Sequence, residues 1–238
     1  KGADYDRRLV WKSLEGFNVQ PYYRAEHLKD IKNTKVQPGD FPYVRGVNTE
    51  TNSWLVRQDF DATNAGQANK KAVEGLERGL NSVGFVIPSS CDASSADVAT
   101  LVNGIDATQH EINFVTGYSS ATLLPKAVEA FKKSGIDMDK VKGSFDFSPL
   151  VALMLNGKFC VDEKKAKELA LEMIENAKEL PQFKLMAARG DIFRNGGSSV
   201  TQELAFALAM GVEYVDWLTD KGVDVEEAFH RLSFTFAV

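Results

Sequence analysis

Charged side chains follow several of the apolar runs that the sequence predicts to be β-strands. Arg57 and Asp59 follow the first run, Asp146 follows the fourth, and Arg189 and Asp191 follow the fifth. Carboxylate and guanidinium groups form strong charge-assisted hydrogen bonds, the kind that bind and orient a polar substrate. If the strands form a parallel barrel, these groups meet at the end where barrels assemble their sites. We therefore expect a functional site at the carboxyl ends of the strands.

Other chemical patterns are weaker. The glycine-rich segment 195–199 (NGGSS) precedes a predicted helix, whose backbone amides could hold an anion. It matches neither the GxGxxG fingerprint nor a P-loop, so a tight turn is the simpler interpretation. The histidines His27, His110 and His230 have no second ligand at a metal-binding spacing. No GxSxG elbow or cysteine nucleophile is recognisable. The sequence predicts no metal site.

The composition is that of an ordinary globular protein. Of 238 residues, 44% are hydrophobic and 26% are charged, and the net charge is −5. Such an acidic chain lacks the clustered basic residues that nucleic acid or an anionic membrane requires. No apolar run approaches the roughly 18 residues of a membrane-spanning helix. The two cysteines, Cys91 and Cys160, lie far apart, which fits a reducing compartment. We expect a cytoplasmic protein.

Residues 1–52 differ from the rest of the chain. Pro21, Pro38 and Pro42 interrupt them, and no helical pattern lasts more than a turn. Disordered segments lack aromatic residues, whereas the aromatic residues in this segment include Trp11, Phe17, Tyr22, Tyr23, Phe41 and Tyr43. We predict an extended N-terminal arm over residues 1–52 that lies across a partner or across the domain that follows.

From residue 53 onward, predicted strands and helices alternate. The strands begin near residues 54, 83, 111, 142, 183 and 233. Asn64 with Gln67, and Ser199 with Gln202, have the spacing of helix capping boxes, and Ser94 also precedes a predicted helix. Alternation predicts a parallel sheet with right-handed crossovers. Six strands could complete an open doubly wound sheet, or they could be six of the eight strands of a (β/α)8 barrel.

Several stretches resemble the methylmalonyl-CoA mutase family. They are residues 11–23 (WKSLEGFNVQPYY), 25–28 (AEHL), 38–46 (PGDFPYVRG), 54–58 (WLVRQ), 202–209 (QELAFALA) and 229–234 (FHRLSF). The first three are similar to the N-terminal arm of the family, and the others to its first strand, fifth helix and sixth strand. The resemblance therefore favours an α/β fold in which residues 53–238 form a (β/α)8 TIM barrel of the cobalamin-dependent mutase type. This barrel would be truncated after about its sixth strand, with two further units beyond residue 238.

The resemblance also implies an activity. In this family the barrel threads acyl-coenzyme A along its axis, and a separate C-terminal domain binds adenosylcobalamin and covers the barrel mouth. The reaction is a radical rearrangement that interconverts methylmalonyl-CoA and succinyl-CoA, a step of propionate metabolism. The cofactor performs the difficult chemistry, while the protein positions the substrate and protects the radicals.

The sequence departs from the family pattern at the catalytic positions. Catalytic members carry Arg-Gln-Tyr at the end of the first strand, whereas Arg57 and Gln58 are followed here by Asp59. Catalytic members also carry Gly-Tyr-His after the fifth strand, and the matching third residue is Ile192, which has no donor. Losing one such donor costs about 10²–10³ in rate. In catalytic members a tyrosine-rich stretch before the first strand contacts coenzyme A. The matching stretch here is shortened to residues 47–53. We expect no catalytic residues, with Arg57 and Gln58 as vestigial substrate-binding positions.

In lacking these catalytic residues, the chain resembles the small subunit of the heterodimeric bacterial members of the family. That similarity implies a non-catalytic barrel that stabilises a catalytic large subunit, with adenosylcobalamin bound by the complex and not by this fragment. Two alternatives stay open. One is a catalytically active adenosylcobalamin-dependent acyl-CoA mutase in which Asp59 selects a different substrate. The other is an unrelated doubly wound protein that binds a small anion at Gly196 and Gly197.

Overall fold

The computed structural model describes residues 4–51, 53–88 and 96–237. The chain divides into two compact units, residues 1–54 and residues 55–238. Cys91 and Ser94, which entered the sequence analysis, lie outside the described residues. None of the described helices is long and apolar enough to cross a membrane.

The regular elements are short in the first unit and long in the second. The helices are α1 (Tyr5–Leu9), α2 (Ala65–Glu77), α3 (Val98–Val102), α4 (Ser120–Ser134), α5 (Pro149–Asn156), α6 (Glu163–Asn176), α7 (Asp191–Asn195), α8 (Val200–Thr219) and α9 (Val225–His230). The strands are β1 (Trp11–Lys12), β2 (Asn18–Val19), β3 (Arg57–Asp61), β4 (Ser82–Val86), β5 (Glu111–Val115), β6 (Gly143–Phe147), β7 (Phe183–Arg189) and β8 (Leu232–Thr235). The 3-10 turns are η1 (Ala25–Leu28), η2 (Lys32–Lys35), η3 (Gly117–Ser119) and η4 (Met138–Lys140).

The first unit exposes most of its apolar side chains. It contains α1, the antiparallel pair of β1 and β2, and the turns η1 and η2. None of its described residues is buried. Trp11 is 66% exposed and Phe41 is 82% exposed, which is unusual for large aromatic residues in a folded protein. The partner-wrapping role expected of residues 1–52 stays a prediction.

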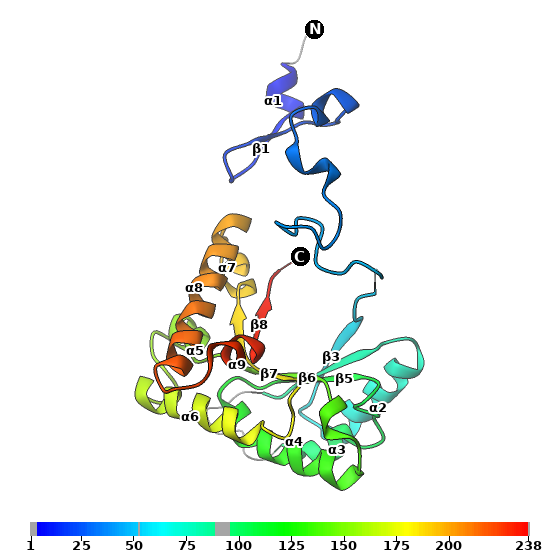
Figure 1. Ribbon diagram of the computed structural model, residues 1–238, viewed down its shortest axis with the longest axis vertical. Helices are drawn as coiled ribbons and strands as arrows, with labels where there is room; N and C mark the ends of the chain where they lie inside the picture. The colour runs from blue at the N-terminus through cyan, green and yellow to red at the C-terminus, as the bar shows by residue number, and fades with distance from the viewer. Residues whose placement is uncertain (1–3, 52, 89–95, 238) are drawn as a thin grey trace. The chain divides into compact units, whose positions relative to one another are not determined.

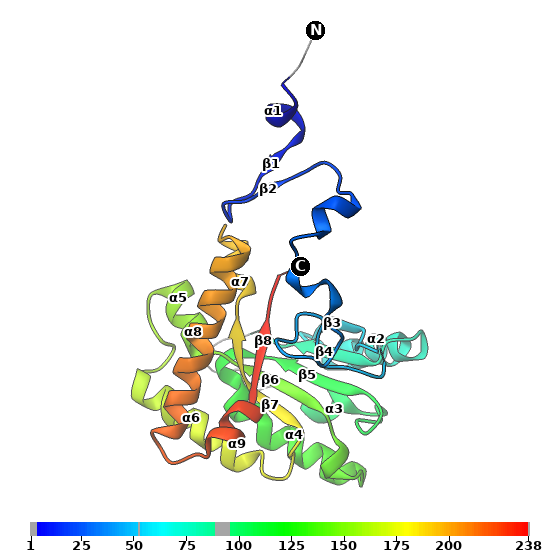
Figure 2. The same cartoon turned by 45° about the horizontal axis from the view of Figure 1, so that its top comes forward.

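The second unit is built on a six-stranded parallel sheet whose strands lie in chain order from β3 to β8. Helices α2, α3, α4, α6 and α8 line one face of this curved sheet (Figures 1 and 2). A doubly wound sheet reverses its strand order and carries helices on both faces. The doubly wound alternatives are therefore wrong. Sequential strands with helices outside are consistent with part of a TIM-type barrel.

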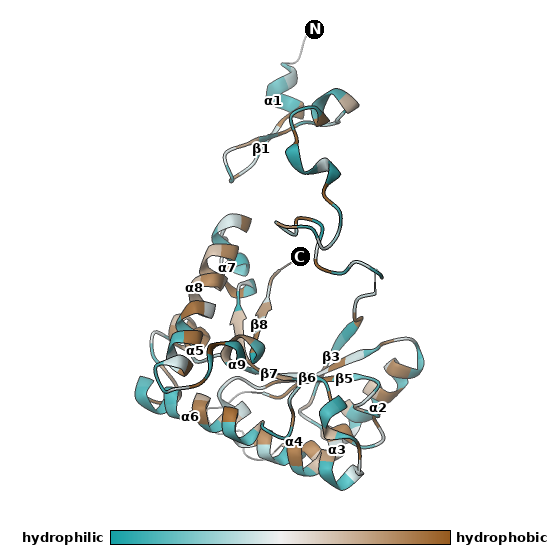
Figure 3. Cartoon of the chain, viewed as in Figure 1, coloured by the Kyte–Doolittle hydropathy of each residue, from teal (hydrophilic) through white to brown (hydrophobic). Residues whose placement is uncertain are grey.

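The two faces of the sheet have opposite character because side chains alternate along a strand. On the helix-covered face, four buried phenylalanines from neighbouring strands, Phe85, Phe114, Phe145 and Phe183, form a continuous row. Their successive ring centroids lie 6.1, 4.7 and 6.1 Å apart. The helices that cover this row alternate polar and apolar residues, as the teal and brown bands of α2, α4 and α6 show in Figure 3. This face therefore holds the hydrophobic core.

Local capping signals position two of the crossover helices. The Asn64 side chain accepts a hydrogen bond from the Gln67 backbone amide at the start of α2. Ser199 and Gln202 form a complete capping box at the start of α8. The capping box predicted at Ser199 is confirmed, whereas at α2 only the Asn64 half of the predicted box is present. Each cap satisfies a backbone donor that a helix start leaves unpaired.

The structure also corrects several details. The first strand of the sheet begins at Arg57 and not near Trp54, which is 69% exposed. The side chain of Asn81 accepts the hydrogen bond from the Val56 amide, so ladder pairing starts one residue later. Helix α7 was not predicted, and segment 195–199 therefore connects two helices instead of a strand and a helix. Cys160 is disulfide-bonded, a state that the expected reducing compartment does not favour.

The phenylalanine row gives a stability prediction. Phe145 is fully buried and stacks on Phe114, so Phe145→Ala leaves a cavity in the centre of the core. We expect a loss of about 3–5 kcal/mol in the free energy of unfolding, measured by urea denaturation. Leu155→Ala is the matched control, because Leu155 is 67% exposed and its truncation should change stability by less than about 0.5 kcal/mol. Equal losses in both variants would contradict this view of the core.

Candidate functional site

The inner face of the sheet borders a cavity of about 950 Å³. Strands β3, β5, β6, β7 and β8 contribute its lining. The charged residues among the lining are Arg57, Asp59, Glu111, Asp146, Lys184 and Arg189. Since all the lining residues belong to the second unit, this cavity is a property of the partial barrel alone.

A chain of hydrogen bonds crosses the middle of this inner face. The Ser82 hydroxyl donates to Glu111 Oε1 at 3.0 Å, and the Asn113 amide donates to the same oxygen at 3.0 Å. Asn113 also donates to Ser82 Oγ at 3.0 Å, and its own oxygen accepts from Ser144 at 2.6 Å. Because Ser82 and Asn113 are buried, these bonds satisfy polar groups that would otherwise destabilise the fold.

At the β3 edge, Arg57 and Asp59 form an ion pair. Arg57 Nε lies 2.6 Å from Asp59 Oδ1, and the two side chains are 34% and 44% exposed. Residues two apart in a strand point to the same face, so both side chains extend over Gly84 of the neighbouring strand. The guanidinium of Arg57 therefore already has an anionic partner within the chain.

Asp146 lies at the carboxyl end of β6 and is held by backbone donors. Its Oδ1 accepts from the amides of Thr116 and Gly117 at 2.6 and 2.8 Å. Its Oδ2 lies 3.9 Å from Arg189 Nη1. Burial raises the pKa of Asp146 and outweighs the two amides and the Arg189 charge, which lower it. The loop after β5 thus presents its amides to a carboxylate of the chain itself.

Arg189, at the end of β7, forms a two-point pair with Asp191. Arg189 Nε and Nη2 lie 3.1 and 2.6 Å from the two Asp191 oxygens. These hydrogen bonds, followed by the charges of Asp191, Asp146 and Asp59, raise the pKa of Arg189 further above its already high value. The guanidinium is therefore permanently charged and is bound at two of its donors by the Asp191 carboxylate.

The structure gathers only some of the residues that the sequence singled out. Arg57, Gln58 and Asp59 lie together on β3 and line the cavity, although they are inside the strand and not after it. Ile192 lies on α7, where it packs against the hydrophobic core and is not part of the cavity lining. The roles assigned to these four residues stay predictions.

Sequence reasoning singled out Asp146 but missed Glu111, Asn113 and Ser144, the other polar residues of β5 and β6 that line the inner face. Glu111 and Asn113 on β5, and Ser144 and Asp146 on β6, occur at alternate positions between apolar residues. Such alternation is the signal of a strand with one polar face. It could have identified the lining of the cavity, but not which polar groups bond to one another.

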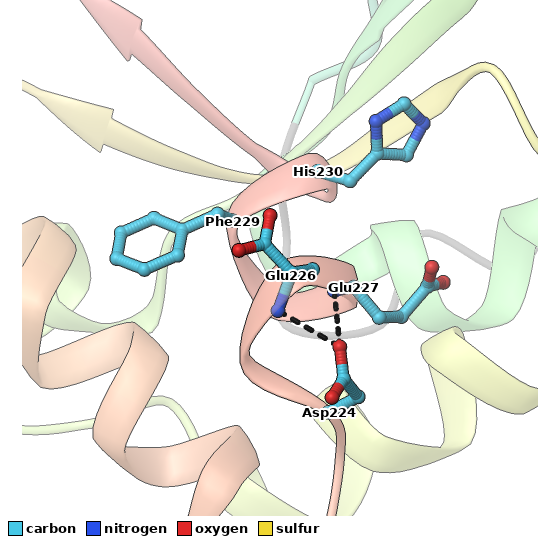
Figure 4. Close-up of a pocket in the computed structure, with 5 residues that line it drawn as sticks. All are labelled: Asp224, Glu226, Glu227, Phe229 and His230. Atoms are coloured by element: carbon cyan, nitrogen blue, oxygen red, sulfur yellow. Dashed lines mark hydrogen bonds between the residues drawn. The ribbon is translucent and has the colours of Figure 1, made fainter.

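A second hollow lies at the surface around α9, and it has different properties. It is shallow and is lined by Asp224, Glu226, Glu227, Phe229 and His230. Asp224 caps the helix by accepting from the amides of Glu226 and Glu227, while Phe229 and His230 point away from one another (Figure 4). His230 Nε2 lies 2.7 Å from the Pro181 oxygen. These side chains serve the helix and do not converge on a common point.

A metal centre is not supported within the described ranges. No group of three or more histidine, cysteine, aspartate or glutamate side chains among residues 4–51, 53–88 and 96–237 could hold a metal ion. The inner-face cavity is therefore an array of ion pairs and hydrogen bonds on a singly wound parallel α/β scaffold.

Comparison with known proteins defines the family. The methylmalonyl-CoA mutase family model matches residues 12–92 and 89–238. The chain is 36% identical over 240 residues to the methylmalonyl-CoA mutase small subunit of Porphyromonas gingivalis. This match covers all of the chain and 38% of that protein. The chain is 27% identical over 239 residues to the methylmalonyl-CoA mutase small subunit of Streptomyces virginiae. This match covers 99% of the chain and 38% of that protein. It is 23% identical over 256 residues to the large subunit from the same organism, covering 97% of this chain and 35% of that protein.

The chain belongs to the methylmalonyl-CoA mutase family. It spans 38% of the Porphyromonas gingivalis relative and a similar share of the others. The resemblance found in the sequence is thereby confirmed at the level of the family.

The opposite environments of two aspartates give a pH prediction. The pKa of Asp146 is raised above its ordinary value of 3.8 by burial, so the stability it contributes is lost as the pH rises through that raised pKa. Hydrogen bonds from Thr63 lower the pKa of Asp61 below the same ordinary value, so its contribution is lost as the pH falls.

We expect Asp146→Asn and Asp61→Asn to change the pH dependence of stability in opposite directions. Relative to Asp146→Asn, the native protein loses free energy of unfolding as the pH rises from below 3.8. Relative to Asp61→Asn, it loses free energy of unfolding as the pH falls below 3.8. Urea denaturation between about pH 3 and pH 7 measures both differences. Differences of the same sign for the two variants would refute the assigned environments.

Proposed function

We propose that this chain is part of the small, non-catalytic subunit of a methylmalonyl-CoA mutase. It pairs with the catalytic large subunit and stabilises it, and the heterodimer interconverts methylmalonyl-CoA and succinyl-CoA. The named small-subunit relatives support this proposal, because identity to the Porphyromonas gingivalis small subunit is 36% whereas identity to the Streptomyces virginiae large subunit is 23%.

The observation that carries the non-catalytic role is the ion pair of Arg57 and Asp59. At the position where the family resemblance expects a tyrosine, Asp59 places a carboxylate 2.6 Å from the guanidinium that would otherwise bind substrate. Closed active sites exclude water and so protect reactive intermediates, whereas the side chains of this pair are 34% and 44% exposed. Ile192 supports the same proposal, because it lacks a donor and packs into the core.

The residues of this cavity do not fit the surroundings of adenosylcobalamin that the family resemblance implies. The pair of Arg57 with Asp59 lies within β3, and the pair of Arg189 with Asp191 lies at the carboxyl end of β7, so both bring formal charges to this face of the sheet. We therefore assign the cofactor to the level of the complex and derive no step through it for this chain. The proposal includes a cytoplasmic location, against which the disulfide-bonded state of Cys160 counts. It includes no nucleic-acid or membrane partner, which the net charge of −5 supports.

The first unit supplies a surface suited to a partner. Trp11, Leu14, Phe17, Phe41 and Val47 are each more than half exposed. Burying such side chains against another protein stabilises a complex by about 25 cal/mol per Å² of apolar area. Among its described positions, the arm has many exposed aromatic residues and no buried ones. Exposed apolar surface of this kind is typical of a site that contacts another protein.

One alternative retains a specific observation. Arg57 and Gln58 keep the residue types of the catalytic pattern and line the cavity, so a catalytically active adenosylcobalamin-dependent acyl-CoA mutase with an altered substrate is a second candidate. In that case Asp59 would select the substrate. The engagement of Arg57 by Asp59 counts against this alternative.

Association with the large subunit tests the proposed role. We expect the protein to co-purify with the large subunit from its own organism, and Phe41→Ala to weaken that association by about tenfold or more, because burying a phenylalanine contributes about 1.5–3 kcal/mol. Titration calorimetry measures the change. Lys35→Ala is the control in the same segment, since a flexible surface lysine contributes little. No association with any mutase large subunit would contradict the proposal.

A turnover assay separates the proposal from its alternative. The protein without its partner, supplied with adenosylcobalamin and methylmalonyl-CoA, should form no succinyl-CoA above the background rate, because the ion-paired cavity provides no positioned donor. Addition of the large subunit should restore product formation. Product from the partner-free protein would favour the active mutase, while its association with the large subunit would be judged separately by calorimetry.

A further inference from the structure

Two arginines that line the inner-face cavity share one arrangement. Each is followed two residues later by an aspartate that binds it: Arg57 pairs with Asp59, and Arg189 pairs with Asp191. The first contact is 2.6 Å, and the second has two hydrogen bonds of 3.1 and 2.6 Å. The pattern Arg-x-Asp therefore occurs twice, and its two arginines line the same cavity from β3 and β7, strands that are not neighbours; Asp191 itself begins α7.

The two pairs belong to one electrostatic unit. Arg57, Asp59 and Arg189 line the same cavity, and the charge of Asp59 contributes to the raised pKa of Arg189. The lining carries three basic residues, Arg57, Lys184 and Arg189, and three acidic residues, Asp59, Glu111 and Asp146. Formal charges of +3 and −3 cancel, so the cavity presents no net attraction to an anion.

Space for the first pair depends on Gly84. A Cβ atom added at this position would collide with Asp59 Oδ1 and would lie 2.7 Å from Arg57 Nη2. Any other residue type at position 84 would therefore displace the ion pair from its present place. This independent feature shows that the neighbouring strand accommodates the closed pair.

We infer that this cavity is a carboxylate-binding site occupied by carboxylates of the chain itself. A guanidinium fork binds a carboxylate through parallel hydrogen bonds, and Asp59 and Asp191 supply that ligand intramolecularly. An incoming small dicarboxylate must displace Asp59 or Asp191 from its arginine. Each aspartate is only two residues from that arginine, so its effective concentration at the guanidinium is high. The native cavity therefore rejects such anions, and removing the two aspartate charges converts it into a site for a small dicarboxylate.

The inference deepens the proposed function, on which it rests because both concern the same cavity. A self-occupied site is one physical reason for a barrel without turnover. Its test measures binding of a small ion to the protein without a partner, so failure to bind the ion and failure to associate with the large subunit are separate results.

The test compares the affinity of native and charge-neutralised proteins for small dicarboxylates. Malonate, succinate and glutarate are titrated by calorimetry into the native protein, Asp59→Asn, and the double variant Asp59→Asn with Asp191→Asn. We expect at least one of these dicarboxylates to bind the double variant about tenfold or more tightly than the native protein, because the Arg57 guanidinium loses its carboxylate and that of Arg189 keeps only the Asp146 oxygen 3.9 Å away. Uncharged succinamide should show no such gain.

Three controls link any gain to the pairs. Asp61→Asn removes a carboxylate from the same strand that bonds to Thr63 and not to an arginine, so it should leave affinity unchanged. Asp59→Glu keeps a carboxylate near Arg57 and should bind no better than native. Adding Arg57→Gln to Asp59→Asn should abolish the gain.

Circular dichroism establishes that each variant is folded. Should the double variant not fold, Asp59→Asn alone carries the test, because its side chain is 44% exposed and the substitution is nearly isosteric. Native binding as tight as that of the folded variants would overturn the inference. So would a folded variant with no gain for any of the three dicarboxylates, or an equal gain in Asp61→Asn.

Discussion

The structure depends on a single constraint, the strict division of the sheet into an apolar outer face and a polar inner face. Helices cover one side of the sheet only (Figures 1 and 2), so the phenylalanine row of Phe85, Phe114, Phe145 and Phe183 must hold the unit together from that side. Among the residues that the structure describes, no helix of the second unit covers the inner side, and the strands there carry polar groups that hydrogen-bond to one another. The hydrogen-bond chain through Ser82 and Asn113 stabilises this face without a second core.

The same alternation explains why ion pairs replace open binding groups. On β3, residues two apart must share a face, so an aspartate two positions after an inward arginine meets it directly. Asp146 is anchored by the amides of Thr116 and Gly117. Arg57 and Arg189 have thus each acquired a carboxylate acceptor from the chain. An anion entering the cavity would have to break such a contact before it made one.

Local signals predicted the elements well, and long-range contacts decided what the sequence could not show. Asn64 and Ser199 mark helix starts because their caps act within three residues. The apolar run at Trp54 predicts a strand too early, because the Val56 amide bonds to Asn81, 25 residues away. Helix α7 is only five residues long and has no side-chain cap, so no periodicity announces it. Strand order, which excludes a doubly wound sheet, is likewise a non-local property.

The separation of the two faces also explains how a barrel of this family can keep its fold while its chemistry changes. Stability resides in the outer phenylalanine row and its helices, whereas Arg57, Asp59 and Arg189 lie on the opposite face of the same strands. Substituting inner-face side chains alters charge and hydrogen bonding in the cavity but removes no core contact. Catalysis requires donors that wait unpaired for the transition state, while a stabilising subunit requires only a rigid scaffold. The pairs of Arg57 with Asp59 and of Arg189 with Asp191 therefore support the non-catalytic role that we propose.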